Sequence, residues 1–182
     1  IVGCGNIFPM HAVSIVRCPN AELVAVCDVK KDRADAKAAE FGVKAYYDYK
    51  EMLDSEELDA IHICLPHYLH MPVAEYAINK GVKVLSEKPM SVDYESAERV
   101  TKLAEEKGVL VGIVSQCRYN NSAKLVKETV SSGKLGKIIS CRSTLTWSRD
   151  DEYYKGSDWK GTWDKEGGGV VIDQAIHSID LV

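Results

Sequence analysis

The chain has 182 residues and a formal net charge of −4, with 46% hydrophobic and 27% charged residues. These values are ordinary for a globular protein and leave room for one domain and part of another. The mildly acidic balance argues against nucleic acid or an anionic membrane as the main partner, because both select clustered lysine and arginine. No apolar run approaches the roughly 20 residues of a membrane span, and the first residues do not resemble a signal peptide.

The six cysteines are scattered and form no C-x-x-C pair. They are Cys4, Cys18, Cys27, Cys64, Cys117 and Cys141. Reduced cysteines that behave as small hydrophobic residues fit this pattern better than a disulfide framework or a zinc site. We therefore expect a cytoplasmic protein with no bound metal.

Strand-like and helix-like segments alternate over the first two-thirds of the chain, which predicts a parallel sheet with crossover helices. The expected strands cover residues 1–2, 23–27, 46–47, 60–65, 83–86 and 109–114. The expected helices cover 9–17, 32–41, 49–53, 70–79 and a segment from Asp93, as N-cap, to near Gly108. Glycines that follow the helical patterns are typical C-caps.

The pattern changes after Gln116, and we place a domain boundary near Cys117. An amphipathic helix is expected over 122–132, and the alternating segment 137–147 predicts an antiparallel strand. An aromatic stretch then precedes three glycines and a last helix. Both ends of the chain look cut, because the first strand is too short and the last helical pattern is interrupted. We expect a truncated chain.

The segment Gly3-Cys4-Gly5-Asn6-Ile7-Phe8 follows an apolar strand and precedes a helix. Its glycines permit a tight turn and close approach of backbone N–H groups to a pyrophosphate, and the helix dipole favours the anion. Phe8 replaces the third glycine of the usual fingerprint, so a glycine turn without a nucleotide is the alternative. Asp28 ends the next strand, where a carboxylate binds the adenosine ribose hydroxyls. Its alternative role is the N-cap of the following helix.

The acid at the end of that strand also bears on the choice of cofactor. A carboxylate repels the 2′-phosphate of NADP and so favours NAD. However, Lys30, Lys31 and Arg33 lie close enough in sequence to offset that repulsion. We expect NAD, with NADP not excluded.

Two motifs carry a resemblance to a known family. Glu87-Lys88-Pro89 follows an expected strand, and a glycine run beginning at Gly167 leads into Asp173, His177 and Asp180. Over the whole chain they resemble the Gfo/Idh/MocA family, named after glucose–fructose oxidoreductase and inositol dehydrogenase. The resemblance implies oxidation of a hydroxyl of a sugar, sugar acid, nucleotide sugar or inositol.

The resemblance also implies an α/β fold of two parts. A Rossmann dinucleotide-binding domain is expected over residues 1–117. The beginning of a substrate and oligomerisation domain, α/β with a mainly antiparallel sheet, is expected over residues 118–182. In the family that sheet often forms the oligomer interface, so a homodimer or homotetramer is expected.

By resemblance, Lys88 and His177 are catalytic and Asp173 lies beside them. Ala175 replaces the glycine of the family's D-x-G-x-H spacing and keeps the site small. Asp173 and His177 are four residues apart on an expected helix and so face the same way. A histidine can take a hydroxyl proton as the hydride leaves, and a lysine ammonium can stabilise the developing alkoxide. A pair of metal ligands and a buried structural pair are the alternatives.

Further cofactor contacts are expected where strands end, because ligands bind at the carboxyl edge of such sheets. Arg118 follows the last strand of the first domain, and an interdomain salt bridge is its alternative role. His70 lies in a segment that resembles the family's nicotinamide ribose region, with a structural role as its alternative. The complete expected set is Gly3, Gly5, Asn6, Ile7, Asp28, Arg33, Leu65, Pro66, His67, His70, Glu87, Lys88, Gln116 and Arg118.

Substrate contacts are expected from both domains. Aromatic residues in the second domain could offer flat faces to a sugar ring, although aromatics this dense more often pack a loop or an interface. These aromatics are Tyr153, Tyr154, Trp159 and Trp163. The expected substrate set is Lys88, Arg149, Trp163, Asp173 and His177.

The sequence therefore predicts an NAD-dependent dehydrogenase of a sugar, sugar derivative or inositol. An NAD-dependent glycosidase or epimerase that oxidises its substrate transiently is one alternative. A non-catalytic nucleotide-sensing regulator is the other. The intact lysine, aspartate and histidine argue against the regulator.

Overall fold

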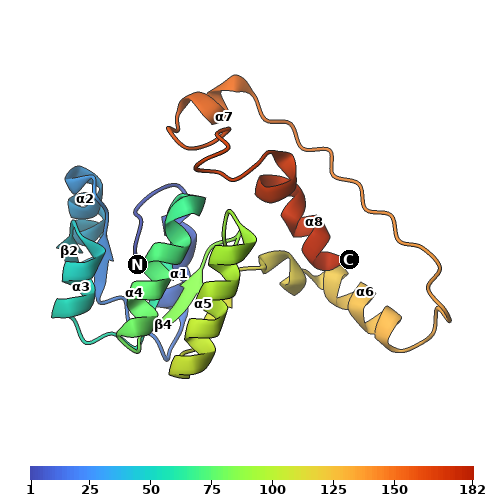
Figure 1. The fold of residues 1–182 in the computed structure, drawn as a ribbon, viewed down its shortest axis with the longest axis horizontal. Coiled ribbons are helices and arrows are strands. Elements are labelled where there is room, and N and C mark those ends of the chain that lie inside the picture. The colour runs from blue at the N-terminus through green and yellow to red at the C-terminus, as the bar shows by residue number, and fades with distance from the viewer. The chain divides into compact units, whose positions relative to one another are not determined.

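The computed structural model describes all of residues 1–182, in two compact units, Ile1–Ile113 and Val114–Val182 (Figure 1). The first unit alternates strands and helices. The second contains helices and long irregular segments. None of the helices combines the length and apolar character needed to cross a membrane.

The first unit is built on parallel strands. They are β1 (Ala25–Cys27), β2 (Lys44–Tyr46), β3 (Ala60–Ile63), β4 (Lys83–Ser86) and β5 (Val111–Ile113). Val2 bridges in parallel to Cys27 on one side and to Ile63 on the other, which gives the order β2-β1-Val2-β3-β4-β5. This order is typical of dinucleotide-binding Rossmann domains, and the strand order reverses at Val2, where such sheets bind their ligands. The predicted parallel sheet is confirmed.

Helices connect successive strands of this unit. They are α1 (Phe8–Arg17), α2 (Lys31–Phe41), α3 (Tyr49–Ser55), α4 (His70–Asn79) and α5 (Tyr94–Lys107). Asp93 caps α5 by accepting a hydrogen bond from the Ser96 N–H at 2.7 Å. Gly42 and Gly108 end α2 and α5 in the left-handed conformation that glycine adopts without strain. These caps confirm the helices expected from the pattern.

The core lies on both faces of the sheet. One hydrophobic cluster joins the strands to α3, α4 and α5, and a second joins them to α1 and α2. Val26 belongs to the second cluster and its neighbours Ala25 and Cys27 to the first, as the alternation of side chains along a strand requires. Phe8 is fully buried and its ring contacts that of Phe41 edge-on, with centroids 5.7 Å apart.

Three of the six cysteines are buried in this unit. Burial raises the pKa of Cys4 to about 11 and the pKa of Cys27 and of Cys64 to about 12. These thiols are therefore protonated and behave as small hydrophobic residues, as expected. Cys18 and Cys141, in contrast, are exposed.

The second unit has no strand. Its elements are the 3-10 turn Gln116–Tyr119, α6 (Asn121–Ser131), α7 (Asp151–Lys155), the π-helical turn Val171–Ala175 and α8 (Ile176–Leu181). The helix expected over 122–132 is confirmed as α6. The antiparallel strand expected over 137–147 is wrong, because residues 137–150 lack regular structure and are mostly exposed. A ladder needs a neighbouring strand to accept its backbone hydrogen bonds, and this unit offers none.

Candidate functional site

The glycine turn occupies the point where the strand order reverses. Gly3 donates its N–H to the Cys27 carbonyl at 2.7 Å and has φ +100°, a conformation that favours glycine. A Cβ at this position would lie 2.3 Å from the Cys64 carbonyl oxygen, so no other residue fits. Gly5 faces open space. No side chain caps the start of α1 at Ile7, and Pro9 in its first turn has no N–H. The N–H groups of Phe8 and Met10 donate to the Gly5 and Ile7 carbonyls at 3.2 and 3.1 Å, so the helix dipole, rather than free N–H groups of this first turn, favours an anion here.

Asp28 connects the end of β1 to this turn. One carboxylate oxygen accepts the Cys4 N–H at 2.9 Å, and the other accepts the Lys30 N–H at 2.9 Å. The N-cap residue of α2 is Lys30, so the alternative role of Asp28 as the N-cap is wrong. A carboxylate oxygen retains a second lone pair for a ribose hydroxyl. The turn and the acid together fit a dinucleotide.

Phe8, which replaces the third glycine, does not obstruct the turn, because its ring is buried against α2. Arg33 lies exposed on α2, and its charge, like that of Lys37, acts on the Cys4 thiol in the turn. The ammonium of Lys37 lies 5.7 Å from the centre of the Phe8 ring. Lys37, one helical turn after the expected Arg33, is a further basic residue beside the turn that the sequence pattern did not indicate.

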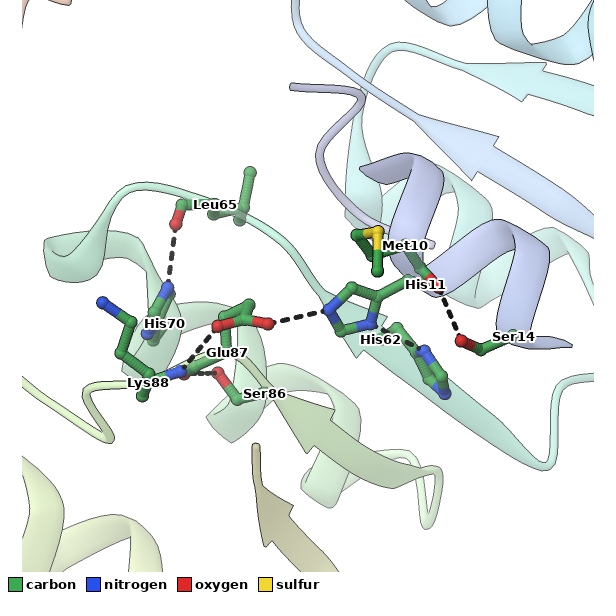
Figure 2. A network of polar contacts seen from close by, with 9 residues as sticks. All are labelled: Met10, His11, Ser14, His62, Leu65, His70, Ser86, Glu87 and Lys88. Atoms are coloured by element: carbon green, nitrogen blue, oxygen red, sulfur yellow. Dashed lines mark hydrogen bonds and ion pairs between the residues drawn. The ribbon is translucent and has the colours of Figure 1, made fainter. Parts of the chain in front are cut away.

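The E-K-P segment follows β4 at the same edge of the parallel sheet. Glu87 donates its N–H to the Ile63 carbonyl at 2.9 Å, which places it beside the end of β3. Its carboxylate lies 2.9 Å from His11 Nε2 and also accepts the Lys88 N–H at 3.2 Å (Figure 2). Burial tends to raise the pKa of Glu87, but the hydrogen bonds from His11 and Lys88 lower it overall. The carboxylate is therefore ionised.

A second histidine extends this contact. The Nδ1 atoms of His11 and His62 lie 3.0 Å apart, so one ring donates a proton and the other accepts it. Burial, reinforced by the adjacent His11, lowers the pKa of His62 to about 4. His62 is therefore neutral at neutral pH.

A third histidine holds the other end of the E-K-P segment. His70 is fully buried, and its ring nitrogens lie 2.8 Å from the Pro89 carbonyl and 2.8 Å from the Leu65 carbonyl. Burial lowers the pKa of His70. Both nitrogens are thus directed to the backbone, as in the structural alternative for this residue. His67 is also buried, with its ring centre 5.8 Å from that of His70.

Arg118 forms an ion pair inside the second unit. Its Nε and Nη2 atoms contact the two carboxylate oxygens of Asp180 at 2.8 and 2.6 Å, a bidentate geometry. Hydrogen bonding to Arg118 lowers the pKa of Asp180. The salt bridge expected between domains is therefore a pair within one unit. Gln116 lies in the 3-10 turn that carries Arg118.

Asp173 belongs to a buried polar cluster of the second unit. The Tyr153 hydroxyl donates to Asp173 Oδ2 at 2.9 Å, and Gln174 Nε2 donates to the same oxygen at 2.6 Å. Gln174 in turn accepts from Arg149 Nη2 at 2.8 Å. The Lys160 ammonium lies 3.6 Å from the centre of the Tyr153 ring. The cluster brings Asp173 and the expected substrate residue Arg149 together.

His177 and Asp173 lie in different helical elements. Asp173 lies in the π-helical turn, whereas His177 lies in the first turn of α8, so the single helix expected here is two elements. π-Helical turns inside helices occur frequently at functional sites. The His177 ring is half-buried, with its centre 6.3 Å from that of the Trp147 ring. Trp163, expected at the substrate, is 83% exposed.

The two polar clusters join residues that are far apart in the sequence, so no local pattern predicts them. The partner of Glu87 is His11, 76 residues earlier in the chain, and the partner of Asp173 is Tyr153. One signal was present, because His11 follows Phe8 and precedes Ala12 on the apolar face of a helix. A histidine on such a face needs a polar partner.

The strand order, the glycine turn and Asp28 define a dinucleotide-binding Rossmann domain. Residues 1–115 match the GFO_IDH_MocA family, described as an oxidoreductase family with an NAD-binding Rossmann fold. Residues 123–182 match the GFO/IDH/MocA C-terminal domain. The chain therefore belongs to the Gfo/Idh/MocA family, and its first unit is an NAD-binding Rossmann domain.

The relatives of this chain include sugar and inositol oxidoreductases. The chain is 30% identical to glucose-6-phosphate 3-dehydrogenase from Bacillus subtilis, over 100% of this chain and 51% of that protein. It is 32% identical to inositol 2-dehydrogenase from Rubrobacter xylanophilus, over 99% of this chain and 49% of that protein. The chain thus spans about half the length of the curated relatives it matches.

A solved structure of the family superposes closely. It is the WlbA dehydrogenase from Bordetella pertussis in complex with NADH and UDP-GlcNAcA, with a TM-score of 0.95 and 34% identity. The match covers 99% of this chain and 56% of that chain. The corresponding enzyme from Chromobacterium violaceum, also with NADH and UDP-GlcNAcA, has a TM-score of 0.96 at 29% identity, over 100% of this chain and 52% of that chain.

Proposed function

We propose that the protein transfers a hydride between a hydroxyl-bearing carbon of a sugar, sugar derivative or inositol and the nicotinamide of NAD. The observation that carries the proposal is the position of Lys88. It follows β4 at the carboxyl edge of the parallel sheet, where the glycine turn and Asp28 also lie. A cofactor held by the turn and a cationic side chain for the substrate therefore share one edge.

NAD, when bound, supplies the hydride acceptor. In this proposal the glycine turn and the start of α1 hold the pyrophosphate, and Asp28 accepts the ribose hydroxyls. Both Asp28 oxygens already accept backbone N–H groups, so the carboxylate is fixed before the ribose arrives. His70 is not among the proposed NAD contacts, because both its ring nitrogens contact backbone carbonyls. The proposed contacts are Gly3, Gly5, Asn6, Ile7, Asp28, Arg33, Leu65, Pro66, His67, Glu87, Lys88, Gln116 and Arg118.

The chemical step is assigned to three residues. Lys88 holds the substrate hydroxyl and stabilises the negative charge that develops on its oxygen. His177 accepts the hydroxyl proton as the hydride departs, which suits a group whose ordinary pKa is about 6.5. Asp173, fixed by Tyr153 and Gln174, orients the substrate or the histidine.

The substrate class follows from the relatives. The named relatives act on glucose 6-phosphate and on inositol, and the two solved structures hold a nucleotide sugar acid. We propose a sugar, a nucleotide sugar or an inositol, contacted by Arg149 and Trp163 of the second domain. The second domain, 118–182 in our division, would carry the substrate site and an oligomer interface. The names of the relatives favour neither a transient-oxidation hydrolase nor a regulator.

A substrate panel tests the proposal. The protein is incubated with NAD or NADP and with sugars, sugar phosphates, nucleotide sugar acids and inositols, and reduced cofactor is followed by its absorbance. We expect turnover with one member and NAD, and none in Lys88→Ala. Binding of NAD without turnover of any member, and without loss of binding in Lys88→Ala, would support the nucleotide-sensing regulator instead.

A further inference from the structure

The carboxylate of Glu87 is nearly buried and serves two groups at once. Its side chain is 12% exposed and that of His11 is 7% exposed. One oxygen contacts His11 Nε2 at 2.9 Å, and the other accepts the backbone N–H of Lys88 at 3.2 Å (Figure 2). An ionised carboxylate only accepts hydrogen bonds, so Nε2 of His11 carries the proton. The contact therefore runs from α1, through Glu87, to the backbone of Lys88.

His62 makes this contact independent of the charge of His11. If His11 is neutral, its Nδ1 accepts a proton from His62 Nδ1 across the 3.0 Å contact. If His11 is an imidazolium, it donates to the neutral His62 instead. In both states Nε2 still donates to Glu87. The histidine pair thus keeps Glu87 satisfied whichever ring holds the shared proton.

The residues on both sides of Lys88 therefore contact buried imidazoles. Glu87 is held by His11 from α1, and the Pro89 carbonyl lies 2.8 Å from His70 Nδ1 at the start of α4. The Glu87 N–H donates in addition to the end of β3. Such anchoring restricts where the Lys88 side chain can begin, and a misplacement of about 1 Å can cost on the order of 10² in rate.

We propose that His11, acting through Glu87, is a positioning residue for Lys88. The inference rests on the proposed function, in which Lys88 contacts the substrate. The inference gives α1 a second role. Its N-terminus is proposed to bind the pyrophosphate, and its next turn, through His11, would fix the position of the Lys88 backbone. If His11 has this role, a hydrogen-bond donor of different shape can replace it. If His11 only packs, such a replacement has no advantage over an apolar one.

Three variants and one control separate positioning from packing. His11→Leu fills the space but donates no hydrogen bond. His11→Gln places an amide N–H near the position of Nε2. Glu87→Gln keeps the size of the side chain but leaves one acceptor oxygen, so it cannot accept from both His11 Nε2 and the Lys88 N–H, which now use separate oxygens. Ser14→Ala, on the exposed face of α1, is the control.

The first readout does not depend on activity. The amide chemical shift of Lys88, followed by NMR against pH, reports the ionisation of Glu87. In the unmodified protein its midpoint should lie below the usual glutamate value of about 4.3, because the hydrogen bonds lower that pKa. The midpoint should rise in His11→Leu, stay low in His11→Gln and Ser14→Ala, and vanish in Glu87→Gln. An equal midpoint in His11→Leu and His11→Gln overturns the proposal.

The second readout is kinetic. We expect kcat to fall about 10- to 100-fold in His11→Leu and Glu87→Gln, with a smaller change in the NAD Kd, and His11→Gln to recover most of the loss. If His11→Leu does not fold, the contrast between Glu87→Gln and His11→Gln decides. A loss of NAD affinity that matches the loss of kcat, or no recovery in His11→Gln, contradicts positioning. A failure of the proposed function appears separately, as the expected Glu87 midpoints at the Lys88 amide with no turnover on any substrate.

Discussion

The carboxylate of Asp28 accepts a hydrogen bond from the backbone N–H of Cys4 at 2.9 Å, which joins the end of β1 to the glycine turn. This contact fixes the acid relative to the N-terminus of α1. The pyrophosphate and the adenosine ribose of a dinucleotide need sites at a set separation, and the two groups sit on adjacent strands. The residue that holds the turn in place is thus also the one proposed to bind the ribose hydroxyls.

Asp28→Ala should weaken NAD binding about 10- to 100-fold, because a hydrogen bond to a charged group contributes about 1.5–3 kcal/mol. NADP binding should weaken less, since the variant also removes repulsion of the 2′-phosphate. The preference for NAD should therefore narrow in calorimetric titrations. Asp32→Ala, an exposed acid in the first turn of α2, is the matched control. Tighter binding of NADP than of NAD by the unmodified protein would refute the cofactor assignment.

The sequence could predict what depends on short-range pattern. Strand and helix periods located β3, β4, α4 and α5 within a few residues, and the glycine turn with Asp28 located the cofactor edge. The pattern over 137–147 failed, because alternation shows which side chains share a face but not whether a partner strand lies alongside. The contact of His11 with Glu87 also could not be predicted, since it joins residues 76 apart whose proximity only the fold creates.

The free energy of unfolding should fall as the pH falls from about 6.5 to 4, because His62 is protonated more readily in the unfolded chain than in the folded one. Its pKa is lowered from 6.5 to about 4 by burial and by His11, so the unfolded chain binds a proton that the folded chain refuses. Stability therefore rises with pH in this window, with a limiting slope of about 1.4 kcal/mol per unit that partial solvent exposure reduces. Chemical denaturation at several pH values measures it.

His62→Asn should reduce that slope without removing it. The buried His70 has a lowered pKa and contributes with the same sign. Glu87, whose pKa is lowered, contributes stability above the usual glutamate value of about 4.3 that is lost only at more acid pH. In the variant, His11 still faces the side chain at position 62, so only one histidine of the pair is removed. An unchanged slope between pH 6.5 and 4 would show that His62 titrates normally in the folded protein.

Arg118 and Asp180 should behave as one unit. Because the two side chains form a bidentate pair, Arg118→Ala and Asp180→Asn should shift the thermal midpoint by similar amounts, and the double variant should be no worse than either. Arg118 is exposed, so the shifts should be small. Calorimetric titration with NAD tests the other role expected for Arg118, which is a contact with the cofactor. Additive shifts together with a tenfold loss of NAD affinity in Arg118→Ala would place the arginine at the cofactor.

Tyr153→Phe should disturb Asp173 specifically. The phenol donates to Asp173 and accepts from Gln174, so its loss removes two hydrogen bonds of a partly buried cluster. We expect the free energy of unfolding to fall by about 1–2 kcal/mol and kcat to fall more than NAD affinity. Tyr154→Phe is the control, since its ring packs edge-on against Tyr153. Equal effects of the two variants would mean that the hydroxyl of Tyr153 is not the important group.

Lys88→Ala and His177→Ala should each lower kcat by at least about 10²-fold, the lower end of what a general acid or base contributes. Cofactor affinity should change far less, since neither residue is assigned to the pyrophosphate or the adenosine. Turnover should fall at acid pH with a group near the ordinary histidine value of ~6.5, because an imidazolium cannot accept the hydroxyl proton. That acid limb should vanish in His177→Ala. If His177→Ala turned over within a few-fold of the unmodified protein, the base role would pass to Lys88 instead.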